Sequence, residues 1–497
     1  MEDGLTKHKI QKTVIIGAGP VGSLAALYAA NRGHDVELYE LRGDLRNPSV
    51  TPLNFTKSIN LALSERGINA LKQSKNNELL TKILNETLPM KARMIHSRSK
   101  SGLLCEESQD YDIHGRAIYA IDRSTLNSRL LEELEALPNV KLFFNHKLVG
   151  VDFKSNEARL QIISNSLPDN FERNKSHEVM VKFDLLIGAD GAHSAVRQQM
   201  MKNMCMEYSQ SYIDTLWCEF TIKARESPSS DQSSQSKFQI SPEHLHIWPG
   251  KEYMFIAIPS LSGDFVCTLF APSSIYEHLA QSHEVLLEFF NQKFPGVTPE
   301  LIPPASLIES FTQNPHLPLI SIRCSPHHYG DSAVILGDAT HAMVPFFGQG
   351  MNAGLEDVRI LFQIFDRHTI SSNYSLDSRK LALEQYSALR TKDSEAISQL
   401  ALENYLVMRN SVTSYKYKSR KWLEEKLNLW FPSLGWATKY SRVSFGNDRY
   451  SEVISKSKRQ EAIINQILLV METMTLIGTI CGILKVKKIL VNLSRWK

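Results

Sequence analysis

Residues 13–40 have the sequence TVIIGAGPVGSLAALYAANRGHDVELYE, and this stretch decides the fold of the chain around it. A β-branched run leads into a GxGxxG motif and an Ala/Leu-rich segment, and a second strand-like run ends at Glu40. This is the pattern of a dinucleotide-binding βαβ unit. Gly17 allows the tight turn, Gly19 lets the backbone approach a pyrophosphate, and Gly22 lets helix and strand pack closely. Glu40 is predicted to accept a hydrogen bond from a ribose hydroxyl, which a glycine-rich turn without a ligand would leave unexplained.

Two later stretches predict further strands of the same sheet. FDLLIGADG (183–191) is a buried-type strand that ends at Asp190, and GDATHAMVPFFGQGMNAGLED (337–357) follows a short apolar strand. Because parallel strands present their carboxyl ends at one edge, Asp190 and Asp338 are expected beside the GxGxxG loop. The helix that begins near Met351 adds free backbone amides, which suit an extended anion.

The composition is that of a long, folded chain with more than one structural unit. It has 497 residues, of which 42% are apolar and 22% charged, and such a length exceeds one ordinary core. Six cysteines lie far apart, with no CxxC pair and no secretory signal, which favours reduced thiols over disulfides or a zinc site. Eight of the 56 Lys and Arg residues and two of the 53 Asp and Glu residues follow position 455. Residues 1–455 therefore carry a net charge of −3, which argues against nucleic-acid binding by the body.

The remaining patterns predict an α/β fold with an inserted domain. Turn-separated, strand-like runs between 206 and 319 predict an antiparallel β-sheet substrate domain that carries a Ser/Gln-rich insertion. The flanking parts are expected to form a Rossmann-like domain, followed by a C-terminal helical region and a tail. The predicted domains are 1–205 with 320–370 for the dinucleotide domain, in which 85–122 contribute to the substrate pocket, 206–319 for the sheet domain, 371–455 for the helical region and 456–497 for the tail.

Basic and phenolic side chains gather between residues 89 and 123, with Arg93 and Tyr111 among them. Such a cluster suits a pocket for a small carboxylate, although a polar sheet face has the same composition. Asn404, on a predicted helix over 376–408, either faces the same pocket or serves packing and surface.

The tail contains an apolar segment, Ile467–Leu484, which is flanked by lysines and interrupted by Glu472. As a helix it would extend about 27 Å at ~1.5 Å per residue, close to the ~30 Å of a hydrocarbon core. We expect a membrane anchor or a helix that lies on a membrane, and the alternative is an amphipathic helix packed on the body.

The three motifs occur in the order GxGxxG, DG and GD, at Gly17–Gly22, Asp190-Gly191 and Gly337-Asp338. In this order they resemble the single-component (class A) FAD-dependent aromatic hydroxylases, in which one dinucleotide domain holds FAD and NADPH has no Rossmann domain of its own. The chain likewise has no second GxGxxG. The resemblance covers nearly the whole length through the segments SINLALS (58–64), KARMIH (91–96), LHIWP (245–249), PFFGQGMNAG (345–354) and ENYLVMR (403–409).

The resemblance implies roles for individual residues. It implies an FAD site formed by Gly17, Gly19, Val21, Gly22, Tyr39, Glu40, Arg42, Ala62, Arg123, Leu148, Asp190, Ala195, Asp338, Met351 and Asn352. It implies that Arg93 grips the carboxylate of an amino-acid substrate and that Tyr111 completes the clamp, with Asn404 and Tyr440 as further contacts. The chemistry is centred on the flavin, so no side chain is assigned as catalytic and no metal is expected. Phe346, Phe347 and Gln349 are expected to form the reaction pocket.

The implied reaction is hydroxylation of L-kynurenine to 3-hydroxykynurenine, in tryptophan catabolism and NAD biosynthesis. NADPH would reduce the bound FAD, and O₂ would then form a flavin C4a-hydroperoxide. The resemblance also implies attachment to the outer mitochondrial membrane through the tail, with the catalytic body facing the cytosol. Two alternatives stay open: a hydroxylase of another aromatic acid on the same scaffold, and an FAD-binding membrane adaptor without turnover.

Overall fold

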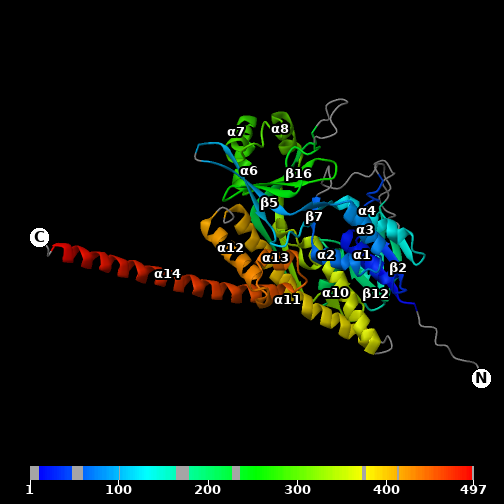
Figure 1. Ribbon diagram of the computed structural model, residues 1–497. Coiled ribbons are helices and arrows are strands. Elements are labelled where there is room, and N and C mark those ends of the chain that lie inside the picture. The colour runs from blue at the N-terminus through cyan, green and yellow to red at the C-terminus, as the bar shows by residue number, and fades with distance from the viewer. Residues whose placement is uncertain are drawn as a thin grey trace, which may run out of the picture.

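The computed structural model describes residues 10–47, 60–99, 101–163, 178–225, 236–371, 376–410 and 414–494. Figure 1 shows a body built of sheets and helices, from which the C-terminal helix projects far to one side. Three features of the sequence analysis lie outside these residues: the first two residues of SINLALS, most of the Ser/Gln-rich insertion at 226–235, and the side chain of Glu472.

The main sheet confirms the predicted βαβ unit. Among the described residues, six strands lie in the order β18-β19-β12-β1-β2-β8, and all neighbours are parallel except β18 and β19. Its strands are β1 (Lys12–Ile16), β2 (Asp35–Tyr39), β8 (Val140–Phe143), β12 (Leu185–Gly188), β18 (His328–Tyr329) and β19 (Ala333–Ile335).

Opposite faces of this sheet have different covers, because successive side chains of a strand point to opposite sides. Ile15 packs with helices on one face, whereas Val14 and Ile16 pack against a small sheet and α5 on the other. The helical cover consists of α1 (Pro20–Ala30), α2 (Glu65–Lys72), α3 (Asn77–Asn85), α4 (Arg123–Glu135), α10 (Gly350–Ser371) and part of α11 (Leu376–Arg409). The opposite cover consists of β9 (His146–Asp152), β10 (Glu157–Ile162), β11 (Glu178–Lys182) and α5 (Ala195–Asn203).

A second large sheet carries the predicted substrate domain. Its seven strands lie in the order β17-β13-β16-β15-β14-β5-β6. They are β5 (Ala92–Arg98), β6 (Leu104–Asp110), β13 (Glu207–Ile222), β14 (His244–Pro249), β15 (Met254–Pro259), β16 (Phe265–Ala271) and β17 (Leu317–Ser325). A separate three-stranded sheet consists of β3 (Asn60–Leu63), β4 (Leu88–Met90) and β7 (Ile118–Asp122). In the sequence, β3 and β4 precede β5, and β7 follows β6.

The strands that follow residue 206 pair antiparallel with one another, as predicted, whereas β5, from outside the predicted domain, adds a parallel pair. β5 pairs with β14 in parallel, because β5 enters the sheet from the first domain rather than through a hairpin. The sheet also continues past the predicted boundary at 319, since β17 runs to Ser325 along β13. Helices α6 (Ser273–Leu279), α7 (His283–Lys293) and α8 (Pro304–Gln313) supply a cover that the strand pattern did not predict.

The two faces of this sheet serve different purposes. Trp248 of β14 points into a core formed with α6, α7 and α8. Its neighbour Ile247 points to the other face and packs in the cluster that contains Phe346, Phe347 and residues of α11. The second face therefore becomes a wall beside the loop 345–349.

The C-terminal part is helical, as predicted. It consists of α11, α12 (Tyr415–Trp430), η3 (Pro432–Leu434), α13 (Lys439–Ser444) and α14 (Tyr450–Ser494). Figure 1 shows that only the first part of α14 lies on the body. Across the described residues, no helix combines the length and the apolar character needed to cross a membrane.

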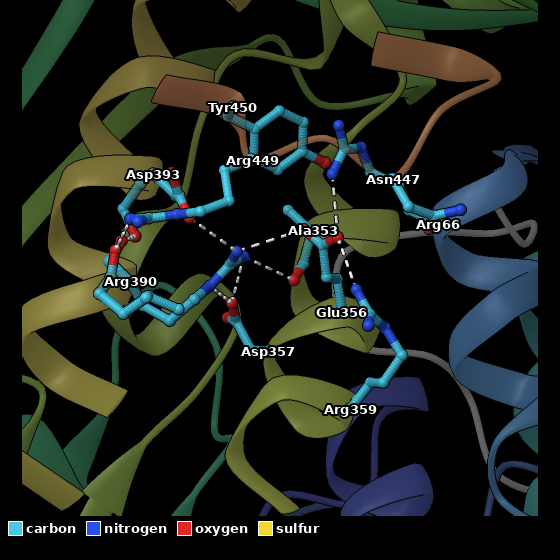
Figure 2. Close-up of polar contacts among 12 residues, drawn as sticks. Arg66, Ala353, Glu356, Asp357, Arg359, Arg390, Asp393, Asn447, Arg449 and Tyr450 are labelled. Atoms are coloured by element: carbon cyan, nitrogen blue, oxygen red, sulfur yellow. Dashed lines mark hydrogen bonds and ion pairs between the residues drawn. The ribbon is translucent and has the colours of Figure 1, made fainter. Parts of the chain in front are cut away.

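A buried ion network joins α2, α10, α11 and the start of α14 (Figure 2). Arg390 of α11 lies 2.6 Å from Asp357, 3.2 Å from Glu356 and 3.5 Å from Asp393. Arg66 of α2 lies 2.9 Å from Glu356. All five side chains are at most 2% exposed, so each charge depends on its partners for compensation.

We predict that Arg390→Met destabilises the protein strongly, because three buried carboxylates lose their common cation. A broken buried ion pair typically costs about 3–5 kcal/mol, and the urea midpoint should fall accordingly. Lys82→Met is the control, since Lys82 bonds Glu78 and Glu133 at the surface and its loss should leave the midpoint nearly unchanged. Equal midpoints for the two variants would contradict the importance of the network.

Candidate functional site

Three loops meet at the carboxyl edge of the main sheet. The Gly17 N–H donates to the Tyr39 carbonyl at 2.8 Å, and the Ala189 N–H donates to the Ile16 carbonyl at 2.8 Å. A Cβ on Gly17 would lie 2.4 Å from the Ala189 carbonyl oxygen. The GxGxxG loop, the end of β2 and the DG loop are therefore in direct contact, as their positions after parallel strands predict.

The first loop has the features of a pyrophosphate site. No side chain caps the N-terminus of α1, so its first amides stay available to an anion. A Cβ on Gly22 would lie 1.9 Å from the Gly17 carbonyl oxygen, whereas a Cβ on Gly19 would meet nothing within 4 Å. A side chain at position 22 is thus excluded by packing. At position 19 the space beside the backbone is free of protein atoms, as a bound pyrophosphate would require.

Glu40 lies directly after β2 and is held by the neighbouring backbone. Its carboxylate accepts hydrogen bonds from the Ala18 N–H at 2.8 Å and from the Arg42 N–H at 3.0 Å. Both carboxylate oxygens are oriented before any ligand binds. A ribose hydroxyl can then donate to a remaining lone pair, because a carboxylate accepts several hydrogen bonds.

Asp338 lies at the same edge, on a turn that is held by a hydrogen bond from Gly337 to Asp357 of α10. Gly337 has a φ of +59°, and its N–H donates to the buried Asp357 carboxylate at 2.9 Å. A Cβ on Gly354 would lie 2.6 Å from the Val21 side chain and 3.2 Å from the Gly337 Cα. Helix α10 therefore packs directly on this turn, and Asp338 itself is exposed at its outer side.

Asp190 has a structural task that the motif did not predict. Its carboxylate accepts hydrogen bonds from Ser194 Oγ at 2.6 Å, Ala195 N at 2.7 Å and Val196 N at 3.1 Å. Burial raises the pKa of Asp190, while these hydrogen bonds lower it. Asp190 thus fixes the first turn of α5 at the carboxyl edge of the main sheet. Its direct contact with a cofactor stays a prediction.

The other predicted cofactor residues surround the same edge. Asn352 connects two parts of it, since its amide donates to the Ala62 and Gly348 carbonyls at 2.8 Å each and accepts from the Ser64 N–H at 2.8 Å. The remaining positions are the end of β2 (Tyr39), the first residue of α5 (Ala195), strand β9 (Leu148), the first turn of α10 (Met351), and the exposed Arg42 and Arg123.

The four predicted substrate residues meet in one cavity of about 240 Å³. Arg93, Tyr111, Asn404 and Tyr440 come from four separate stretches of the chain, and all of them line it together with Phe347. The rest of the lining, from α11, α12, α13 and α14, includes Glu403, Arg420, Lys421, Glu424, Lys439 and Glu461.

Arg93 lies against stacked aromatic rings. The Tyr111 and Tyr440 rings stack 4.8 Å apart, and the Tyr440 and Phe347 rings 5.4 Å apart. The Arg93 guanidinium carbon lies 4.5 Å from the Tyr440 ring centre. Arg93 is 5% exposed, and burial raises the pKa of both tyrosines, so both keep their hydroxyl protons near neutral pH. The polar neighbours of the Arg93 guanidinium include the Tyr111 and Tyr440 hydroxyls.

The predicted pocket residues of the loop 345–349 separate in the structure. Phe347 lines the cavity, whereas Phe346 stacks on Tyr405 at 4.0 Å and lies one layer behind. The Phe346 carbonyl accepts a hydrogen bond from the Asn404 amide at 2.7 Å. Gln349 is 2% exposed and faces Ser64 and Tyr450.

The aromatic residues of 422–450 differ in their exposure. Of these residues, Tyr440 reaches the cavity, whereas Trp422, Trp430 and Phe431 are at least 50% exposed. The sequence analysis missed Tyr450 and the ionic groups at the mouth of the cavity. These charges looked like an ordinary solvated helix surface, and only a spacing of three or four between opposite charges could have indicated pairs such as Arg420 and Glu424.

The comparisons define the class of protein. A family model described as an FAD binding domain matches residues 11–399. The fold resembles a 2-methyl-3-hydroxypyridine-5-carboxylic acid oxygenase (18% identity, TM-score 0.59, 82% of this chain and 94% of the other). It also resembles Pseudomonas aeruginosa PqsL (18% identity, TM-score 0.59, 80% and 97%). The chain is an FAD-dependent monooxygenase.

Relatives at higher identity narrow the class. The kynurenine 3-monooxygenase of Neurospora crassa is 60% identical over 92% of this chain and 90% of its own length. The same enzyme of Chaetomium globosum is 60% identical over 91% and 95%, and that of Aspergillus clavatus is 56% identical over 92% and 89%. The chain belongs to the kynurenine 3-monooxygenase family.

We predict that Gly19→Ala lowers the FAD content of the purified protein by about tenfold or more, because a methyl group enters the space that the pyrophosphate needs. The thermal midpoint of the FAD-free protein should not change, since this Cβ meets no protein atom. Gly478→Ala, also in open space, should keep full flavin absorbance per chain. Full FAD content in Gly19→Ala would refute the position of the pyrophosphate.

Proposed function

We propose that this protein hydroxylates L-kynurenine to 3-hydroxykynurenine, with bound FAD, NADPH and O₂ as the other reactants. The proposal agrees with the names of the relatives. One observation of this chain supports it most: a buried guanidinium without a carboxylate partner lies in an aromatic cavity.

Arg93 differs from the other cations that line the cavity in its ion pairing. Each other cation of the described lining has an acidic partner: Arg420 pairs with Glu424 and Glu461, Lys421 with Glu425, and Lys439 with Glu403. Arg93 makes no such pair among the described residues. A buried charge without a partner is costly, so a substrate carboxylate would supply the missing anion, and a bidentate bond would also fix its orientation.

The aromatic side chains fit the other end of such a substrate. Tyr111, Tyr440 and Phe347 form a continuous stack, against which a flat anilino ring can lie. Phe347 also belongs to the loop that approaches the cofactor edge through Gly348 and Asn352. A substrate held at one end by Arg93 would thus place its ring beside this loop.

The residues around the loop also exclude water. Phe346, Phe347 and Gln349 are between 2% and 6% exposed, so the loop itself is packed against the protein and offers little surface to bulk water. When bound, FAD would accept hydride from NADPH and activate O₂. The protein's part is to orient the ring and keep the site dry, which favours hydroxylation over release of peroxide.

NADPH is proposed as a transient reactant rather than a resident cofactor. The chain has a single GxGxxG, and its loop is assigned to FAD. The reaction would place the enzyme in tryptophan catabolism and NAD biosynthesis.

Turnover by the purified protein with FAD, NADPH and air tests the proposal. L-kynurenine should stimulate NADPH oxidation and give 3-hydroxykynurenine in comparable amounts. Stimulation by another aromatic acid, but not by kynurenine, would support a different hydroxylase. Bound FAD without stimulation by any aromatic acid would support the adaptor without turnover.

We predict that Arg93→Ala raises the KM for L-kynurenine by about 10- to 100-fold, since a hydrogen bond to a charged group is worth roughly 1.5–3 kcal/mol. FAD content should stay near normal, because Arg93 lines the substrate cavity, whose described lining contains no residue of the GxGxxG, DG or GD loops. Lys91→Ala is the control, since Lys91 is an exposed partner of Glu243, and its KM should be unchanged. Loss of FAD in Arg93→Ala, with an unchanged KM, would contradict the assignment.

We also propose that the protein associates with the outer mitochondrial membrane and that its body faces the cytosol. On α14, Ile463, Ile467, Val470, Met474, Ile477 and Leu484 recur at helical spacing and are 37–69% exposed. An exposed apolar stripe of this kind suits a helix that lies in a membrane surface. A second apolar surface lies at the end of α12 and in η3, where Leu429, Trp430, Phe431 and Leu434 are 50–64% exposed, and aromatic residues favour the membrane–water boundary.

An ion pair joins the two helices that carry these surfaces. Arg420 of α12 lies 2.7 Å from Glu461 of α14, and Figure 1 shows that the later part of α14 projects from the body. Ile464 is fully buried, so the packed part of α14 includes this residue. A truncation meant to remove only the membrane contact must therefore keep Glu461 and Ile464.

We predict that a chain ending at Asn465 keeps its FAD content and kynurenine turnover but no longer sediments with vesicles of outer-membrane lipid composition. The full-length protein should sediment with them. Vesicle binding by the shortened chain would contradict the role of α14 and point to the α12–η3 surface. Loss of turnover would show that the exposed part of α14 serves catalysis.

A further inference from the structure

Gln349 lies between the cofactor edge and the C-terminal helix. It follows Gly348, whose carbonyl accepts a hydrogen bond from Asn352 at 2.8 Å. Ser64 Oγ, directly after β3, lies 3.4 Å from the Gln349 side-chain Nε2 and 3.5 Å from its Oε1. Its Oε1 accepts a hydrogen bond from the Tyr450 hydroxyl at 3.2 Å.

Tyr450 is itself held rigidly. It is fully buried, and the guanidinium carbon of Arg66 lies 3.9 Å from its ring centre. Arg66 donates to Glu356 at 2.9 Å, to the Val443 carbonyl at 3.1 Å and to the Asp448 carbonyl. The ring is thus clamped by a side chain that also binds the backbone on the N-terminal side of Tyr450.

The residues beside Tyr450 are tied to the same ion network (Figure 2). Arg449 lies 3.0 Å from Asp393, and Ser451 donates to Asp393 at 2.7 Å. Asp393 in turn faces Arg390. The start of α14 is therefore fixed to α2, α10 and α11 at several points, all of them near the loop that carries Gln349.

We propose that Tyr450 is a positioning residue for the monooxygenase reaction, because its hydroxyl fixes the orientation of the Gln349 side chain in the loop 345–352. This inference rests on the proposed function. The Tyr450 hydroxyl donates to Oε1 of Gln349 at 3.2 Å, and Ser64 Oγ lies at nearly equal distances from both ends of the same amide. The Gln349 side chain therefore joins Tyr450 to the side of the cofactor edge marked by Asn352 and Ala62. Burial raises the pKa of Tyr450, so its hydroxyl remains a donor across the neutral range.

A freed Gln349 side chain would loosen the loop that keeps water from the ring. The consequence should be a change in coupling rather than a loss of binding, since Arg93 and Tyr440 do not contact Tyr450 in the described set of interactions. NADPH would still be oxidised, but more of the oxygen would leave as peroxide.

Tyr450→Phe tests the inference, because it removes the hydroxyl and keeps the ring under Arg66. The ratio of peroxide to 3-hydroxykynurenine should rise about fivefold, as expected for one lost buried hydrogen bond. FAD content should be unchanged. Hydrogen–deuterium exchange of the peptide that covers 345–352 should become faster, and this second result does not depend on turnover.

Tyr386→Phe is the matched control. Tyr386 is also fully buried, and its hydroxyl has no hydrogen-bond partner among the described residues. Its variant should keep the native peroxide ratio and the native exchange of 345–352. Native values for Tyr450→Phe, or equal changes in both variants, would overturn the inference. If the native protein forms no 3-hydroxykynurenine, the proposed function fails, while the exchange data still decide whether Tyr450 orders the loop.

Discussion

The buried carboxylate of Asp357 is the group on which the cofactor side of the structure depends. It accepts the Gly337 N–H at 2.9 Å and lies 2.6 Å from both His341 and Arg390. Burial favours the neutral acid, but His341 and Arg390 outweigh it and hold the pKa of Asp357 below its usual range. One charge therefore fixes the left-handed turn that presents Asp338 and ties it to α10 and α11. Because no water can replace a missing partner there, the turn and the helices are stable only together.

The loop 345–352 gives the molecule a common boundary between its two sites. Phe347 faces the cavity that contains Arg93, whereas Asn352 binds the backbone at the cofactor edge. In the proposed reaction, this short segment would contact the substrate ring on one side and lie beside the flavin on the other. Asn404 of α11 and Tyr450 of α14 both form hydrogen bonds to this loop, so the C-terminal helix contacts the segment between the two sites.

The parts of this arrangement that the sequence predicted are those with a local cause. GxGxxG, Glu40 and the acid after β19 follow strand ends, and a parallel sheet brings strand ends together whatever lies between them. The meeting of Arg93, Tyr111, Asn404 and Tyr440 has no local cause, and only the family resemblance indicated it. The parallel pair of β5 and β14 and the surface position of Trp430 also depend on long-range packing, as does the contact of Tyr450 with Gln349. Composition and periodicity do not predict such contacts, because the residues that flank a tyrosine in the sequence do not show which distant residue its hydroxyl will bond.

We propose that an atom of oxygen is transferred at the flavin edge to a ring held by Arg93. Turnover of L-kynurenine with NADPH under ¹⁸O₂, followed by mass spectrometry of the product, measures this transfer directly. The account predicts 3-hydroxykynurenine that contains one ¹⁸O atom per molecule. Product without the label would show that its hydroxyl oxygen comes from water, and an absence of product would show that this cavity serves another substrate; either result would contradict the account.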